Sequence, residues 1–170
     1  GIDGMSWKIP NQKLAETLTQ LPLSSQPGSQ WRYSLSIDIL GALIEVISQM
    51  PFEQFSRENV FEPLGMVDTD FYVPDEKQDR LATIYKWSDP DLGLQPLIEF
   101  RAPPRALPRT SGGGGLWSTA PDYARFAQML VNKGELDEKR LLSPATVELF
   151  SLNQCPEAAL PYGFEENDLY

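Results

Sequence analysis

Apolar positions along the chain recur mainly with the period of an α-helix. Leucines three and four residues apart predict a short amphipathic helix over residues 12–21. A second helix is predicted over residues 36–49, in which the polar residues Asp38, Glu45 and Gln49 fall on one narrow stripe. Nearly all its other residues are apolar or small. A helix that is apolar on most faces is typical of a buried central element, so we expect this helix to be buried.

Prolines and β-prone residues interrupt the helical pattern in the middle of the chain. Five prolines between residues 88 and 110 predict a loop-rich excursion with extended segments, because proline lacks the N–H that a strand ladder needs. The sequence therefore predicts an α-rich α+β fold with short extended segments. The further predicted elements are a helix over 51–65, a short strand or extended segment over 68–74, a charged surface helix over 75–85, at most an edge strand over 97–101, a helix capped by Thr119 and ending at 133–134, and a short helix over 144–150.

Composition and charge exclude several classes of function. The 170 residues contain no histidine and one cysteine, Cys155, so no imidazole triad, disulfide or thiolate zinc cluster can form within the chain. A net charge of −10 has the wrong sign for a phosphate-backbone binder or for an anionic membrane surface. No apolar run is long enough to span a bilayer. Catalysis would have to use hydroxyls, carboxylates, amines or phenols.

Two polar motifs have structural interpretations that we prefer to functional ones. The tetraglycine 112–115 precedes a helix, but the lysine of a phosphate-binding loop is absent, so a tight, close-packed turn is expected. The carboxylates between Asp68 and Asp79 do not follow the order of a calcium loop and indicate a solvated acidic face. No metal or organic cofactor is expected.

A tyrosine and several hydroxyls stand where a loop enters the predicted central helix. Tyr33 is flanked by Ser34, Leu35 and Ser36. On composition alone, Tyr33 would pack its ring and donate its hydroxyl to a carbonyl. A catalytic role would require a nearby cation, because the ordinary pKa of a tyrosine is about 10.

Several motifs, in order along residues 24–153, resemble the serine β-lactamase-related hydrolases. That group includes penicillin-binding-protein-like enzymes, AmpC-type β-lactamases and the family VIII esterases that share their fold. The resemblance implies the helical region of a β-lactamase/transpeptidase-like fold over residues 1–153, with 154–170 as its tail or a cut end. The motifs are PGxxWxYS at 27–34, DxLG at 38–41, FEPLGM at 61–66, FYVP at 71–74, SGGGGL at 111–116 and LLSP at 141–144.

The resemblance implies a role for Tyr33 in acyl transfer. In that family a serine of an S-x-x-K motif attacks an ester or β-lactam carbonyl, and the tyrosine that Tyr33 matches is the general base or proton relay. Ser34, Leu35 and Ser36 would then line the substrate site. Leu35 stands where β-lactamases place an asparagine, which favours small esters over β-lactams. Neither S-x-x-K nor the later K-T-G or H-x-G motif occurs in the 170 residues, so we expect a central fragment that is inactive alone.

Two other interpretations stay open. The chain can be a noncatalytic homologue, or a structural domain with an interaction surface. The expected partner is a small-molecule ester or lactam, without nucleic acid or a membrane span, and self-association through surface bared by missing parts is a further expectation. The chain begins at Gly1 without a visible leader, and cytoplasmic and periplasmic locations both remain open.

Overall fold

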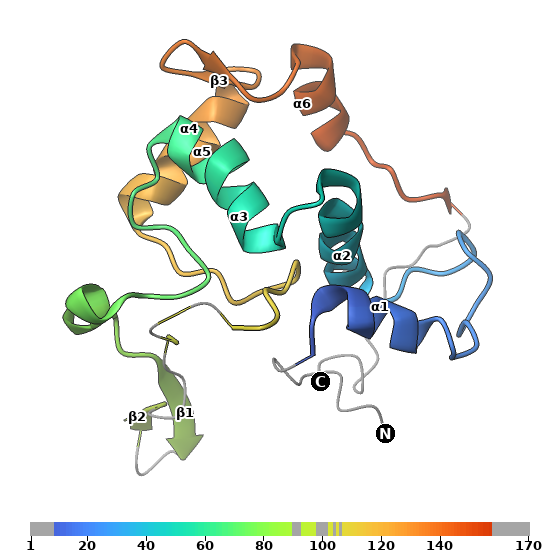
Figure 1. Cartoon of the computed structure of the whole chain (residues 1–170), viewed down its shortest axis with the longest axis horizontal. Coiled ribbons are helices and arrows are strands. Elements are labelled where there is room, and N and C mark those ends of the chain that lie inside the picture. Colours follow the sequence, from blue (N-terminus) through green and yellow to red (C-terminus); the bar gives the residue numbers. More distant parts are fainter. Residues whose placement is uncertain (1–8, 90–92, 98–101, 104, 106, 158–170) are drawn as a thin grey trace.

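The computed structural model describes residues 9–89, 93–97, 102–103, 105 and 107–157. Helices predominate in this part of the chain, and its only sheets are two short antiparallel hairpins (Figure 1). The predicted α-rich α+β class is therefore confirmed. The elements are α1 (Asn11–Leu18), α2 (Ser36–Ser48), α3 (Phe52–Ser56), the π-helix η1 (Arg57–Phe61), α4 (Glu62–Leu64), the 3-10 helix η2 (Asp75–Arg80), β1 (Tyr85–Asp89), β2 (Gly93–Pro96), α5 (Ala120–Val131), β3 (Glu135–Leu136), β4 (Lys139–Arg140) and α6 (Pro144–Phe150).

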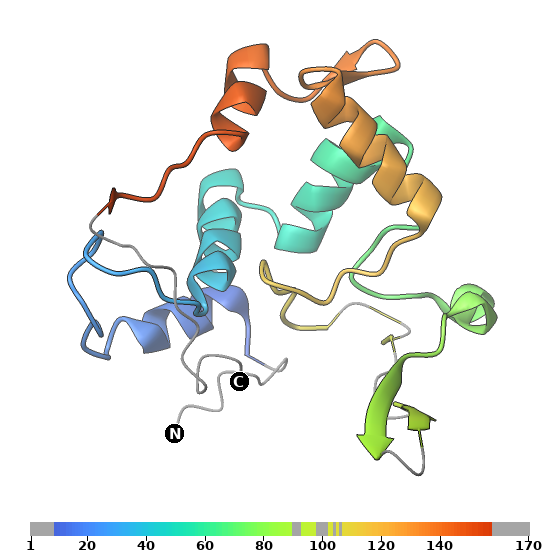
Figure 2. The same ribbon diagram turned by 180° about the vertical axis from the view of Figure 1, so that it is seen from behind.

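Helix α2 forms where the apolar pattern predicts it, but the expectation that it is buried on most faces is wrong. It contacts α1 and α3, and it lies between them in Figure 2. The residues that it buries are Asp38, Gly41 and Ala42. Small side chains at this face let neighbouring backbone approach closely. Most of the large apolar residues of α2 lie on the opposite face and are exposed, while Ile39 and Ile44 are half-buried.

The main apolar core lies between the α3–α4 segment and α5. Phe61, Leu64, Met66, Phe71 and Met129 form one buried cluster, with Leu64 and Met129 almost completely inaccessible to solvent. The helical segment 52–64 carries a five-residue π-helix, and Gly65 ends it in the left-handed conformation with φ 65°. The predicted helix over 51–65 is thus confirmed in extent, although its middle has a wider hydrogen-bonding pattern than an α-helix.

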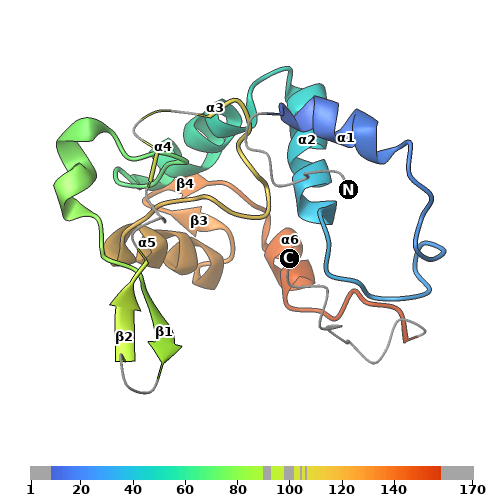
Figure 3. The same cartoon turned by 90° about the horizontal axis from the view of Figure 1, so that it is seen from below.

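The segment from residue 68 to residue 97 differs from its prediction. Residues 68–74 form no strand: they contain one isolated bridge, between Asp70 and Trp117, and the Val73 N–H donates to the Pro103 carbonyl at 2.9 Å. The predicted helix over 75–85 is a 3-10 helix that stops at Arg80, because Leu81 is already extended. The hairpin of β1 and β2 follows and projects away from the helices (Figure 3).

Tertiary pairing explains why this segment departs from its local pattern. The backbone groups of Tyr85 to Trp87 form hydrogen bonds with β2, which lies within the proline-rich excursion. The prediction of a helix over 75–85 did not include this pairing. The edge strand proposed for 97–101 lies outside the described residues except for Leu97, whose N–H donates to the Ile84 carbonyl at 2.7 Å.

The two C-terminal helices both begin at side-chain caps, of which the cap at Thr119 was predicted. The Thr119 hydroxyl accepts a hydrogen bond from the Asp122 N–H at 3.3 Å, and the Ser143 hydroxyl accepts one from the Thr146 N–H at 3.1 Å. The small hairpin of β3 and β4 between these helices was not predicted. Gly134, φ 93°, precedes the hairpin, and Leu142, which follows it, lies so close that a Cβ on Gly134 would be 2.2 Å from the Leu142 carbonyl oxygen.

In the part of the chain that the structure describes, none of the helices combines the length and the apolar character that a membrane crossing requires.

Candidate active site

The segment Tyr33–Ser36 stands at the entrance to α2. Tyr33 is 52% exposed, and the hydroxyls of Ser34 and Ser36 lie 2.8 Å apart. Leu35 is the N-cap residue of α2, and its carbonyl accepts the Ile39 N–H at 3.1 Å. Leucine has no side-chain acceptor, so the first turn of α2 has no side-chain cap from this position. The start of α2 thus presents an exposed phenol and a pair of hydrogen-bonded hydroxyls within four consecutive residues.

A buried polar network contacts the first turn of α2 on the face that carries Asp38. Asp38, only 6% exposed, accepts a 2.6 Å hydrogen bond from the Ser111 hydroxyl, and the Arg109 guanidinium lies 3.8 Å from the same carboxylate oxygen. The Ser111 oxygen in turn accepts the Gly113 N–H at 3.0 Å. Hydrogen bonds to a buried carboxylate are worth more than neutral ones, so this network fixes the helix turn that follows Tyr33.

The tetraglycine segment packs directly on the backbone of α2. A Cβ on Gly112 would lie 2.3 Å from the Ile37 carbonyl oxygen, closer than any side chain tolerates. Only glycine permits that approach. The structure thus bears out the prediction of a tight, close-packed turn at residues 112–115.

A second polar cluster joins α1, α2 and the segment before the glycines. The Asn11 amide donates to the Glu45 carboxylate at 2.9 Å and to the Thr110 carbonyl at 2.8 Å, and Asn11 is itself buried. The same Glu45 oxygen accepts the Phe52 N–H at 3.2 Å. These contacts bring together segments up to 99 residues apart, and no spacing in the sequence could have revealed them.

The acidic residues of 68–79 are only partly the solvated face that the sequence indicated. Asp68 receives hydrogen bonds from Arg80, at 2.7 and 3.0 Å, and from Lys77 at 2.6 Å. Arg80 first and Lys77 second hold the pKa of the Asp68 carboxyl well below its usual range. Asp70 is paired with Arg57 at 3.1 Å, whereas Asp75, Glu76 and Asp79 are exposed. The described residues contain no group of three or more carboxylate or cysteine side chains that could hold a metal ion.

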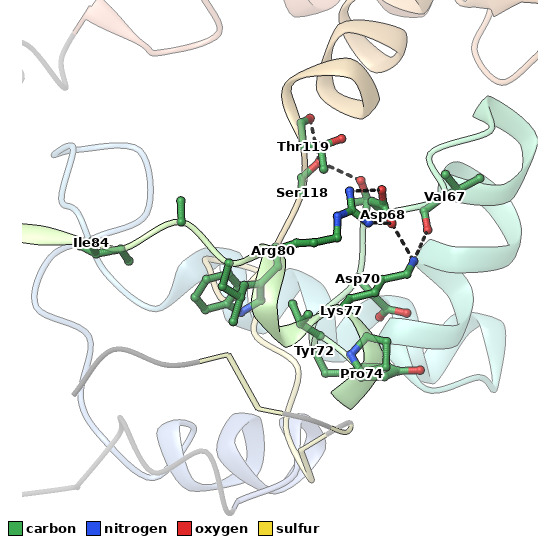
Figure 4. Close-up of a pocket in the computed structure, with 15 residues that line it drawn as sticks. Val67, Asp68, Asp70, Tyr72, Pro74, Lys77, Arg80, Ile84, Ser118 and Thr119 are labelled. Carbon is green, nitrogen blue, oxygen red and sulfur yellow. Dashed lines mark hydrogen bonds and ion pairs between the residues drawn. The ribbon is translucent and has the colours of Figure 1, made fainter. Parts of the chain in front are cut away.

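These paired charges border a cavity of about 380 Å³ between η2 and the segment that leads into α5 (Figure 4). Lys77 and Arg80 point towards Asp68 on one side, while Tyr72, Leu81 and Trp117 supply apolar wall. None of the residues Tyr33–Ser36 lines it. The sequence pattern did not indicate this cavity, because its walls come from two segments about 35 residues apart.

Comparison with known proteins agrees with this architecture. The family model described as Beta-lactamase matches residues 2–166. Protein Rv1367c of Mycobacterium tuberculosis is 39% identical over 149 residues, which cover 86% of this chain and 36% of that protein. Lovastatin esterase of Penicillium rubens is 31% identical over 152 residues, with coverages of 86% and 37%.

A solved structure gives the same result. EstCE1, described as a hydrolase with promiscuous acyltransferase activity, superposes with a TM-score of 0.67 at 31% identity, over 83% of this chain and 39% of its own. The chain belongs to the Beta-lactamase family, and its helix-rich arrangement is that of the β-lactamase/transpeptidase-like fold. It spans less than two fifths of the length of these three relatives.

Proposed function

We propose that the protein containing this chain is a serine hydrolase that cleaves small esters through an acyl-enzyme intermediate. Tyr33 is its general base or proton relay. The observation that carries the proposal is that an exposed phenol stands at the start of a helix whose first turn is fixed by the Asp38–Ser111 contact. The similarity to lovastatin esterase and to the hydrolase EstCE1 supports the same reaction class.

In this proposal the attacking serine and its lysine lie outside the 170 residues. A serine hydroxyl attacks the ester carbonyl, its proton passes to the Tyr33 oxygen, and the alcohol leaves with that proton. The lysine charge favours the phenolate form of Tyr33. Water then attacks the acyl carbonyl while Tyr33 takes a proton from it. The bond between the acyl carbon and the serine oxygen breaks, Tyr33 returns the proton to that oxygen, and the acid product is released.

Leu35 supports esters over β-lactams as substrates. An apolar side chain cannot donate a hydrogen bond to a substrate amide, whereas an ester without an amide group loses nothing at this position. The Ser34 and Ser36 hydroxyls remain as polar contacts at the mouth of the site.

The test is Tyr33→Phe in the full-length protein, with p-nitrophenyl acetate as substrate. We expect kcat/KM to fall by at least about a hundredfold, the usual scale for loss of a general base, while the melting temperature stays unchanged. Tyr123→Phe is the matched control, because Tyr123 is an exposed tyrosine, 65% accessible, on α5. Equal turnover in the Tyr33 and Tyr123 variants would reject Tyr33 as a catalytic residue, and the absence of any turnover in the wild type would favour a noncatalytic homologue.

A further inference from the structure

The cavity between η2 and the segment that leads into α5 has the size and the lining of a small-molecule site. Its volume of about 380 Å³ lies within the range of roughly 300–1,000 Å³ that ligand pockets occupy. Its lining combines charged and polar side chains with apolar ones (Figure 4). Such a mixture is typical of sites that orient a ligand by a few polar contacts and hold it by apolar burial.

One wall of this cavity is held in place by hydrogen bonds between two segments far apart in the chain. The backbones of Asp70 and Trp117 form an isolated antiparallel bridge, with N–O distances of 3.0 and 2.8 Å. The Thr69 hydroxyl donates to the buried Asp122 carboxylate at 2.8 Å and lies 2.7 Å from the Ser118 hydroxyl. Because an ordered wall spares a ligand the cost of arranging it, this side of the cavity is preorganised for binding.

Two cations share one carboxylate at the border of the cavity. Arg80 donates to both Asp68 oxygens from its two terminal nitrogens, at 3.0 and 2.7 Å, and Lys77 donates to Asp68 at 2.6 Å. The other carboxylate in the lining, Asp70, is already paired with Arg57, which does not line the cavity. The group formed by Asp68, Lys77 and Arg80 therefore carries an excess of one positive charge.

Arg80 also has hydrogen-bond donors that Asp68 does not use. A guanidinium has five N–H donors, and the edge that contains Nε can hold a carboxylate through two parallel hydrogen bonds. Asp68 occupies the edge between the two terminal nitrogens, and no hydrogen bond from Nε of Arg80 occurs among the described residues. The Arg80 side chain is 53% exposed, so a ligand can reach it. Both the excess charge and the planar fork favour a carboxylate group.

The apolar part of the lining determines what else the ligand must carry. Tyr72, Leu81 and Trp117 contribute to this part. The net charge of −10 on the whole chain opposes the binding of a simple anion, although the three further carboxylates of η2 do not line the cavity. A ligand must therefore gain affinity from burying an apolar body as well as from its anionic group.

From these observations we propose that the cavity binds a small monocarboxylate with an apolar body. The carboxylate pairs with Arg80 and Lys77, and the apolar body lies against Tyr72, Leu81 and Trp117. None of the residues Tyr33–Ser36 lines the cavity, and this binding does not rest on the proposed hydrolase reaction.

Isothermal titration calorimetry of the full-length protein with hydrocinnamate tests the proposal. Hydrocinnamamide has nearly the same size and shape without the charge, so the ratio of the two dissociation constants measures what the carboxylate contributes. We expect hydrocinnamate to bind at least about tenfold more tightly than the amide, because a hydrogen bond to a charged group is worth roughly that factor or more. Inorganic phosphate, which has no apolar body, should not displace hydrocinnamate.

Three substitutions locate the bound compound. Arg80→Gln should raise the Kd of hydrocinnamate by at least about tenfold, and Leu81→Ala should raise it by a smaller factor. Lys86→Gln is the matched control, because Lys86 is an exposed cation of β1 outside the lining, and it should leave the Kd unchanged. Thermal melts show which variants are folded. If Arg80→Gln is unfolded, Leu81→Ala and the comparison of acid with amide decide the question.

The proposal is overturned if the wild type does not bind hydrocinnamate at millimolar concentration, if the amide or phosphate binds equally well, or if Arg80→Gln and Lys86→Gln weaken binding to the same extent. Loss of binding in Tyr33→Phe would also overturn it, because the compound would then lie at Tyr33. The measurement follows binding and not turnover, so its result does not depend on whether the protein hydrolyses esters.

Discussion

The Ser111 hydroxyl donates a 2.6 Å hydrogen bond to the buried Asp38 carboxylate, across 73 residues of sequence. This contact ties the segment before the tetraglycine to the first turn of α2. The same hydroxyl oxygen accepts the Gly113 N–H, so one side chain orders both partners. The geometry of the Tyr33 segment therefore depends on a residue far from it in the chain.

Replacing Ser111 with alanine should destabilise the fold. The substitution leaves Asp38 with one donor fewer and Gly113 without its acceptor, and we expect the free energy of unfolding to fall by about 1–3 kcal/mol. Urea denaturation of the 170-residue chain measures the change. Ser24→Ala, at an exposed serine, should change stability by less than about 0.5 kcal/mol. Equal effects of the two substitutions would show that the Asp38 contact adds no stability.

Replacement by alanine should lower the stability of the fold at Gly112 much more than at Gly114. In Gly112→Ala the new methyl would meet the Ile37 carbonyl oxygen at 2.3 Å, and backbone must shift, which costs about 1–3 kcal/mol. In Gly114→Ala nothing lies within 4 Å of the new methyl. Thermal melts of the two variants give the comparison. A Gly112→Ala protein as stable as Gly114→Ala would contradict the close packing of the turn on α2.

The Asp68 ion pairs predict a dependence of stability on pH. Their donors lower the pKa of the Asp68 carboxyl in the folded chain from its ordinary value of 3.8. A carboxylate whose pKa is lower in the folded than in the unfolded state stabilises the fold above the unfolded pKa. This stabilisation is lost as the pH falls below about 4 towards the folded pKa.

Denaturation at a series of acidic pH values tests this dependence. Arg80→Gln, which removes the partner with two hydrogen bonds, should make the loss of stability below pH 4 less steep. Lys86→Gln removes an exposed cation from β1 and should leave the steepness as in the wild type. An unchanged slope in Arg80→Gln would show that this pair does not contribute to the acid response.

The sequence correctly predicted the helices that depend on interactions between residues close together in the chain. The Thr119 cap and the apolar repeat after it predicted α5, and the apolar run after Tyr33 predicted α2. Both depend on interactions within about one helical turn. The resemblance to the hydrolase family is also confirmed, because it rests on ordered motifs over most of the chain.

Contacts between segments far apart in the chain could not be predicted from these local patterns. Asp38 was recognised as polar on an apolar helix, but its partner Ser111 lies 73 residues away. Asp68 was assigned to a solvated face because its partners, Lys77 and Arg80, become neighbours only through the 3-10 turn of η2. The exposure of α2 was also missed, since periodicity reports which face is apolar and not whether other polypeptide covers it.

The uncovered face of α2 predicts that the isolated 170-residue chain associates with itself when charge repulsion is screened. At low ionic strength the charge of −10 should keep copies apart, and at about 1 M salt, where the Debye length is about 3 Å, apolar contact should prevail. Sedimentation velocity at both salt concentrations measures this. Leu40→Gln with Leu43→Gln should abolish the association, whereas Val131→Gln should not. Association unaffected by the α2 changes would place the contact elsewhere.

Rapid-quench mass spectrometry of the full-length protein with p-nitrophenyl acetate tests the central claim most directly. The account predicts an acetylated serine within an S-x-x-K motif that forms in the wild type and in Tyr123→Phe, and whose formation slows by about a hundredfold or more in Tyr33→Phe. Acetylation at another residue, or on the same serine at the wild-type rate in Tyr33→Phe, would contradict it.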